Sequence, residues 1–180
     1  MDMKNKLCIV TGANSGIGKA TAMELASRDA YVVMICRNEE RGLNAKKEII
    51  QKTGNTGVEL LLADFSYQYE IREVAEQIIN KFEQVDVLIN NAGTIFHKRE
   101  ETLDGIEKTF AVNHLGPFLL TNLLLPHLKK APEARVINVA SEAHRVGVPV
   151  FDLGNLQLME GFGGVKAYGL SKALQHHVYV

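Results

Sequence analysis

Tyr168 and Lys172 are four residues apart in a segment predicted to be helical, so their side chains share one face. A free tyrosine titrates near a pKa of about 10. A nearby ammonium favours the phenolate and lowers that pKa, which would let Tyr168 exchange a proton with a substrate oxygen near neutral pH. Ser141 could hold the same oxygen by a hydrogen bond. These residues predict acid–base chemistry, with plain surface packing of the Tyr–Lys pair as the alternative.

A glycine-rich turn, TGANSGIG at residues 11–18, stands between a predicted strand and a predicted helix. The first N–H groups of a helix lack intrahelical partners and carry partial positive charge, so a pyrophosphate can bind there. Gly12 permits the tight turn, and Gly16 and Gly18 allow phosphate and strand to approach the helix. The spacing differs from the GxGxxG fingerprint, and a loop without a ligand is the alternative. The residues predicted to contact a nucleotide here are Gly12, Asn14, Ser15, Gly16, Ile17 and Gly18.

Apolar strands alternate with helices along the chain. Predicted strands cover residues 7–10, 31–36, 58–63, 85–90 and 135–140. Predicted helices cover residues 19–26, 39–52, 69–82, 103–130 and 167–178, with a long loop after the fifth strand. In the first helix, Ile17, Ala20, Met23 and Leu25 are expected to pack inward. Strands that are apolar on both faces predict an α/β fold with a doubly wound parallel sheet of the Rossmann type, in one domain over residues 1–180.

Polar residues that follow the predicted strands collect at the carboxyl edge of such a sheet, where ligands bind. An NAD site would carry an acid about 20 residues beyond the glycines, whereas this chain has Arg37 after the second strand. A guanidinium binds a 2′-phosphate, which favours NADP(H) over NAD(H). An exposed arginine without a ligand is the alternative.

Two further strand ends carry candidates for cofactor contact. Asp64 could accept from an adenine amino group, or it could cap the following segment. Asn90, Ala92 and Gly93 lie where the fourth strand would meet the cofactor, although a side-chain bond from Asn90 that braces neighbouring turns is an alternative.

Asn113 and Pro117 interrupt the fourth predicted helix. Proline has no N–H, so residue 117 cannot bond the carbonyl of Asn113, and its ring pushes that carbonyl away. The freed carbonyl could hold a water beside Lys172 as a proton relay. A packing kink without a catalytic role is the alternative.

Composition and charge argue against several classes of partner and site. The formal net charge of −1 and the lack of long charged runs argue against nucleic acid as a partner. No apolar run has the length of a membrane span, and no signal peptide is predicted. Cys8 and Cys36 fall in predicted strands and are expected to be buried, reduced thiols, which suits the cytoplasm. His176 and His177 have no third ligand nearby, so no metal site is predicted.

Taken together, these motifs resemble the short-chain dehydrogenase/reductase family. The motifs are TGANSGIG, Asp64, NNAG at 90–93, Asn113, Ser141 and YGLSK at 168–172. The resemblance implies a catalytic group of Ser141, Tyr168 and Lys172 assisted by Asn113, with Tyr168 and Lys172 also contacting the cofactor. CRN after the second strand, TFAVNHLGPFLLT, ASEAHR and the 27-residue step from Ser141 to Tyr168 are most similar to its retinol dehydrogenase-like branch.

That branch implies NADP(H)-dependent hydride transfer between the nicotinamide and a carbonyl or alcohol substrate, such as a retinoid, a lipid or another small aldehyde or ketone. A non-catalytic, cofactor-binding fragment is the alternative, because the sequence stops eight residues after Lys172. The resemblance implies further strands there, so we expect a sheet without its carboxyl-terminal strands and with an uncovered edge. It also implies homo-oligomers through the helix of Tyr168, if that helix is completed. Many relatives carry a membrane anchor, so peripheral membrane association stays open beside the cytoplasmic prediction.

Overall fold

A computed structural model describes residues 3–178, and their side chains as far as residue 175, so that the side chains of His176 and His177 fall outside it. The strands are β1 (Leu7–Thr11), β2 (Tyr31–Cys36), β3 (Val58–Leu62), β4 (Val87–Asn90) and β5 (Arg135–Asn138). The longer helices are α1 (Gly16–Ser27), α2 (Glu39–Thr53), α3 (Gln68–Lys81), α5 (Gly116–Leu128) and α7 (Gly164–Val178). The short helical turns are α4 (Lys108–Phe110), η1 (Ala111–Leu115), α6 (His144–Gly147), η2 (Val148–Val150) and η3 (Leu153–Asn155).

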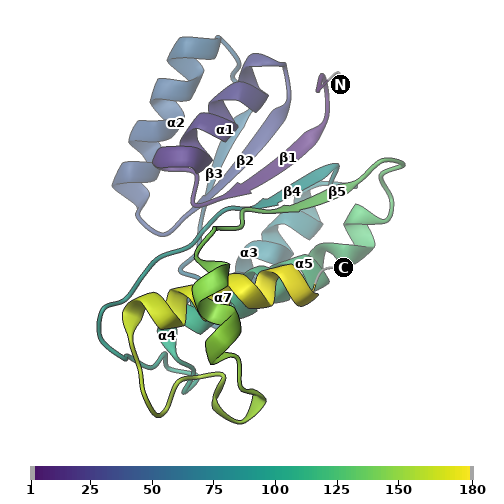
Figure 1. The fold of residues 1–180 in the computed structure, drawn as a ribbon. Helices are drawn as coiled ribbons and strands as arrows, with labels where there is room; N and C mark the ends of the chain where they lie inside the picture. Colours follow the sequence, from purple (N-terminus) through teal and green to yellow (C-terminus); the bar gives the residue numbers. More distant parts are fainter. Residues whose placement is uncertain (1–2, 179–180) are drawn as a thin grey trace.

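The five strands form one parallel sheet in the order β3-β2-β1-β4-β5 (Figure 1). Side chains of successive strand residues pack into two different hydrophobic cores, one on each face of the sheet. Ile9 and Val33 pack with α3 and α5, whereas Val10 and Met34 pack with α1 and α2. Because both faces are covered, the strands are apolar on both sides. The predicted doubly wound α/β fold is confirmed.

Local signals in the sequence place α2 correctly. The side chain of Asn38 accepts a hydrogen bond from the N–H of Arg41, which caps the helix start. Gly54 ends the helix with a φ of 73°, a left-handed conformation that costs glycine little. Cys8 and Cys36 are both buried and free, as predicted.

The inward face predicted for α1 is confirmed for Met23 and Leu25, which pack partly buried against the core, and is wrong for the exposed Ile17 and Ala20 of this helix. Its buried residues are Gly18, Ala22 and Ala26, whereas Ile17 is 67% exposed. Small residues face the sheet because α1 lies close to it, and a larger side chain would hold the helix away.

Helix boundaries after β4 also differ from the prediction. Residues 103–107 form a turn, and the helix begins only at Lys108. Residues 111–115 then form a π-helical turn, a wider winding that fits the missing N–H of Pro117. The long loop after β5 contains α6, η2 and η3, and α7 begins three residues before the predicted start, at Gly164.

β5 forms the edge of this sheet, and its apolar side chains are uncovered. Val136 is 38% exposed and Ile137 is 44% exposed. Because neighbouring residues of a strand point to opposite faces of the sheet, β5 is uncovered on both faces. This matches the expected uncovered edge. Within residues 3–178, no helix is long and apolar enough to cross a bilayer.

Candidate active site

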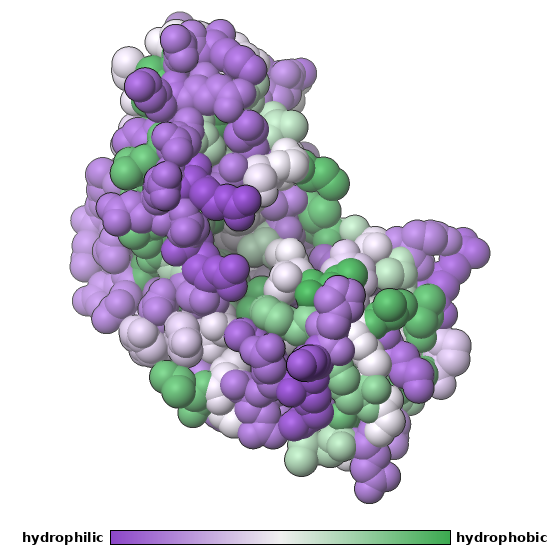
Figure 2. Space-filling model, turned by 90° about the vertical axis from the view of Figure 1, so that its left-hand side faces the viewer, coloured by the Kyte–Doolittle hydropathy of each residue, from purple (hydrophilic) through white to green (hydrophobic). Residues whose placement is uncertain are grey.

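A cavity of about 470 Å³ opens at the carboxyl edge of the sheet. Figure 2 shows the side toward which β1 runs in Figure 1. The surface on this side is hollowed between an upper part that is mostly hydrophilic and a lower part with more apolar surface. Nine of the residues predicted to contact a cofactor line this cavity: Gly12, Asn14, Ser15, Ile17, Gly18, Arg37, Asp64, Ala92 and Gly93. Four strand ends therefore converge on one cavity, although their residues are far apart in the sequence.

The amino end of α1 on this wall is open to an anion. Ser15 is the N-cap but makes no side-chain capping bond, and the first turn carries no acidic residue. Gly16 has a φ of 53°, and no atom lies within 4 Å of the position that a Cβ would take. The free N–H groups, the helix dipole and this clearance fit a phosphate group.

Gly18 has a different task. A Cβ atom at this position would overlap Asn91 Nδ2 and would come within 2.5 Å of the Gly12 carbonyl oxygen. The glycine therefore lets the helix pack against the turn after β4, and it also lines the cavity.

The hydroxyl of Thr11 holds the β4 turn against the glycine-rich turn. Its Oγ1 accepts hydrogen bonds from the N–H groups of Asn91 (3.0 Å) and Ala92 (2.9 Å). The Asn91 side chain returns a bond to the Thr11 carbonyl oxygen at 2.8 Å. Sequence reasoning missed both residues, since only the tertiary fold brings positions 11 and 91 together.

Two arginines line the cavity near the end of β2. Arg37 follows β2 and is largely exposed, and Arg41 lies on the first turn of α2. The sequence analysis missed Arg41. A usable signal was its place in the first turn of the predicted helix, four residues after Arg37. Two guanidinium groups beside an open cavity suit a phosphate better than a neutral hydroxyl.

Asp64 is already engaged within the chain. Its Oδ1 accepts from the N–H (2.9 Å) and the hydroxyl (2.7 Å) of Ser66, and its Oδ2 lies 3.7 Å from Arg37 Nη1. The carboxylate thus caps the turn that leads into α3, while the residue still lines the cavity.

Asn90 lies beneath the cavity, fully buried. Its Nδ2 donates to Thr121 Oγ1 at 3.1 Å and to Asn138 Oδ1 at 2.9 Å. These bonds tie β4 to α5 and β5, which is the bracing role that the sequence left open.

Lys172 is buried and lies next to Gly93, although it is not among the described residues that line the cavity. Its Nζ donates to the Val139 carbonyl oxygen at 2.8 Å and lies 5.7 Å from the centre of the Tyr168 ring. A Cβ on Gly93, which lines the cavity, would lie 3.6 Å from this Nζ. Burial lowers the pKa of Lys172 to about 8.

Asn113 is also fully buried, and its side chain fixes the turn after Gly93. Its Oδ1 accepts from the N–H of Thr94, and its Nδ2 donates to the carbonyl of Thr94, both at 2.9 Å. Its backbone carbonyl, where the sequence predicts a water, also has a partner within the chain. That carbonyl accepts a 2.7 Å hydrogen bond from Gln175 Nε2, because Gln175 lies one turn beyond Lys172 on the helix that packs against η1.

Ser141 lies just before α6, which packs on α7, the helix of Tyr168. The Ser141 hydroxyl accepts from the N–H of Ala143 at 3.2 Å, and α6 begins directly afterwards and packs on α7. Neither residue is among the described residues that line the 470 Å³ cavity. Gly93 thus lines the cavity and also lies next to Lys172.

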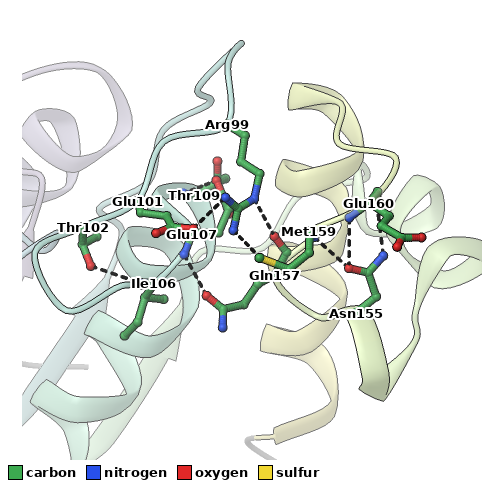
Figure 3. Close-up of polar contacts among 10 residues, drawn as sticks. All are labelled: Arg99, Glu101, Thr102, Ile106, Glu107, Thr109, Asn155, Gln157, Met159 and Glu160. Atoms are coloured by element: carbon green, nitrogen blue, oxygen red, sulfur yellow. Dashed lines mark hydrogen bonds and ion pairs between the residues drawn. The ribbon is translucent and has the colours of Figure 1, made fainter.

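A polar cluster orders the segment between Ser141 and Tyr168 (Figure 3). Gln157 Oε1 accepts from the N–H of Glu107 at 3.0 Å, and Arg99 Nε donates to the Gln157 carbonyl oxygen. The carboxylate of Glu107 caps α4 by accepting from the N–H groups of Thr109 and Phe110. Residues 155–160 therefore dock on the loop after β4 and form an ordered wall beside α7.

Sequence comparison identifies relatives along most of this chain. The sequence model of a family described as short chain dehydrogenase matches residues 6–153. Human retinol dehydrogenase 13 is 48% identical over 152 residues, which cover 84% of this chain and 46% of that protein. Mouse retinol dehydrogenase 12 is 42% identical over 172 residues, covering 96% and 54%. The chain spans about half the length of these curated relatives.

Solved structures give the same picture of the fold. A protein of Mycobacterium paratuberculosis is 34% identical with a TM-score of 0.78, covering 95% of this chain and 59% of that one. A short chain dehydrogenase from Escherichia coli CFT073, solved in complex with NADPH, is 25% identical with a TM-score of 0.78, covering 98% and 70%.

Proposed function

Since this chain belongs to the short-chain dehydrogenase family, we propose that it binds NADP(H) and transfers hydride between that cofactor and a carbonyl or alcohol substrate. One observation carries the proposal. The cavity runs from Arg37 and Arg41 to Gly93, and Gly93 adjoins Lys172. An anion site and a buried amine are thereby joined by a space of cofactor size.

The chain's own residues fit the phosphates of this cofactor. The open first turn of α1 suits the pyrophosphate, and Gly16 leaves the backbone accessible. Arg37 and Arg41 suit the 2′-phosphate, since a cavity with a carboxylate in their place would repel it. The NADPH complex of the Escherichia coli relative supports this choice.

When bound, the cofactor supplies or accepts hydride at its nicotinamide ring. Tyr168 would exchange the accompanying proton with the substrate oxygen, and Ser141 would hold that oxygen. Lys172 Nζ lies 5.7 Å from the centre of the Tyr168 ring, so the ammonium would stand beside the group that exchanges the proton. The named relatives make retinoids and other lipid alcohols and aldehydes the first substrates to test.

A cofactor-binding unit without turnover is the second candidate. It is favoured by a specific observation, because the Ser141 hydroxyl bonds Ala143 and neither Ser141 nor Tyr168 lines the cavity in the described part of the chain. In this case the adenosine half of the site would bind and the acid–base residues would not act.

A titration of the purified chain with NADPH and with NADH, followed by cofactor fluorescence, tests the proposal. We expect tight binding of NADPH and much weaker binding of NADH. Oxidation of NADPH with retinaldehyde and a panel of small aldehydes then separates the candidates, since the enzyme turns over and the binding unit does not. Binding of neither cofactor would refute both candidates.

A further inference from the structure

The side chain of Gln175 bridges two residues of the inner site. It is 3% exposed and lies one helical turn beyond Lys172 on α7. Its Oε1 accepts a hydrogen bond from Lys172 Nζ at 3.0 Å, and its Nε2 donates to the backbone carbonyl oxygen of Asn113 at 2.7 Å. One amide group therefore joins α7 to the π-helical turn η1 at the buried amine.

Each hydrogen bond of this bridge has a fixed donor and a fixed acceptor. An ammonium donates three hydrogen bonds, and Lys172 has two acceptors within residues 3–175, the Val139 carbonyl and Gln175 Oε1. One N–H is then left for a bound ligand on the side of Gly93. A carboxamide accepts only at its oxygen and donates only at its nitrogen, so this link passes no proton unless the amide itself ionises.

We propose that Gln175 is a positioning residue, whose amide holds the Lys172 amine in place against the turn that carries Asn113. This inference rests on the proposed function for its importance, but its geometry can be tested without turnover.

The groups around Lys172 make its titration a clean reporter. Among the side chains described as far as residue 175, Tyr168 is the ionisable neighbour on α7, and η1 contributes the amide and carbonyl of Asn113. The segment after β5 contributes the Val139 carbonyl, and the β4 turn contributes Gly93. His114 on η1 stays neutral near pH 7 and above, because burial lowers its pKa to about 4.

The first experiment follows the ε-carbon of Lys172 by NMR in chain labelled with ¹³C-lysine, with Lys172→Met identifying the signal. In Gln175→Met the ammonium loses an acceptor, so we expect its titration to move to lower pH by about one unit. In Gln175→Glu a carboxylate faces the amine, so the titration should move to higher pH. Gln51→Met, an exposed change on α2, is the matched control and should leave it unmoved.

An unchanged Lys172 titration in Gln175→Met and Gln175→Glu would overturn the proposal and leave Gln175 as a space-filling residue. If the Met variant fails to fold in circular dichroism, the Glu variant still decides, because only a contact with Lys172 raises the titration. NADPH fluorescence is measured in parallel. Shifts in the NMR signal without NADPH binding by the wild-type chain would support the positioning contact and refute the proposed function.

Discussion

Gly147 of α6 packs directly on the backbone of Gly169 in α7, so closely that a Cβ atom on Gly147 would overlap the Gly169 carbonyl group. A Cβ on Gly169 would in turn lie 2.7 Å from the Ala143 carbonyl oxygen. Ala143 is two residues after Ser141, and Gly169 is next to Tyr168. This glycine contact therefore sets how closely the segment of Ser141 approaches the helix of Tyr168.

Gly147→Ala should separate α6 from α7. The added methyl group meets backbone atoms that cannot rotate away, and such overpacking costs about 1–3 kcal/mol. We expect a lower melting temperature and loss of any carbonyl reduction, with NADPH binding retained at the adenosine end. Gly163→Ala is the control, because its Cβ would lie 3.6 Å from the Lys166 side chain, an ordinary contact. Equal behaviour of the two variants would contradict the positioning role of Gly147.

Arg37→Glu should weaken NADPH binding far more than NADH binding. The change replaces a guanidinium on the cavity wall with a carboxylate that repels a 2′-phosphate, and NADH has no such phosphate. Fluorescence titrations with both cofactors measure the ratio of the two dissociation constants. Arg72→Glu, the same charge change at an exposed position on α3, serves as the control. Equal losses for both cofactors would remove Arg37 from the 2′-phosphate site.

Thr11→Val keeps the side-chain shape but removes the hydroxyl that accepts from the N–H groups of Asn91 and Ala92. Leaving these donors unpaired costs about 1–3 kcal/mol in unfolding free energy. Thr109→Val is a matched control, since Thr109 is fully buried and its Oγ1 has no hydrogen-bond partner in the described structure. Urea unfolding should show destabilisation in the first variant only, and a similar loss in both would speak against the Thr11 tie.

The free energy of unfolding should depend on pH because Lys172 titrates differently in the folded and unfolded chain. Its folded pKa of about 8 lies below the unfolded value of 10.5, so the unfolded state binds more protons between these pH values. The contribution of Lys172 to stability therefore rises with pH across that window, by about 3 kcal/mol in total, at roughly 1.4 kcal/mol per unit.

Urea unfolding of the wild-type chain and of Lys172→Met at several pH values from 7 to 11 isolates this effect, because other groups titrate equally in both. Burial raises the pKa of Cys8 to about 12 and of Cys36 to about 11, so the two thiols also affect stability at high pH. We expect the wild-type chain to gain stability relative to the variant as pH rises through 8. A constant difference between the two would show that Lys172 is not held in a buried, costly charged state.

Much of the fold follows from short stretches of sequence. Two-sided apolar runs predict parallel strands covered on both faces, and Asn38 and Gly54 mark both ends of α2 through local backbone chemistry. The convergence of Gly12, Arg37 and Gly93 on one edge also follows, because parallel strands all point their carboxyl ends the same way. These features depend on residue order and local geometry alone.

Tertiary structure decided what each side chain contacts. The sequence predicts both inward packing and a nucleotide contact for Ile17, and only the structure puts its side chain on the cavity wall. It leaves Asn90 between a cofactor contact and a bracing bond, and the structure shows its bonds to Thr121 and Asn138. It also could not show that Gln175 would reach the Asn113 carbonyl, a contact between residues 62 positions apart. Such contacts depend on how closely elements pack and how far a side chain extends, and neither quantity is written in the pattern of a single segment.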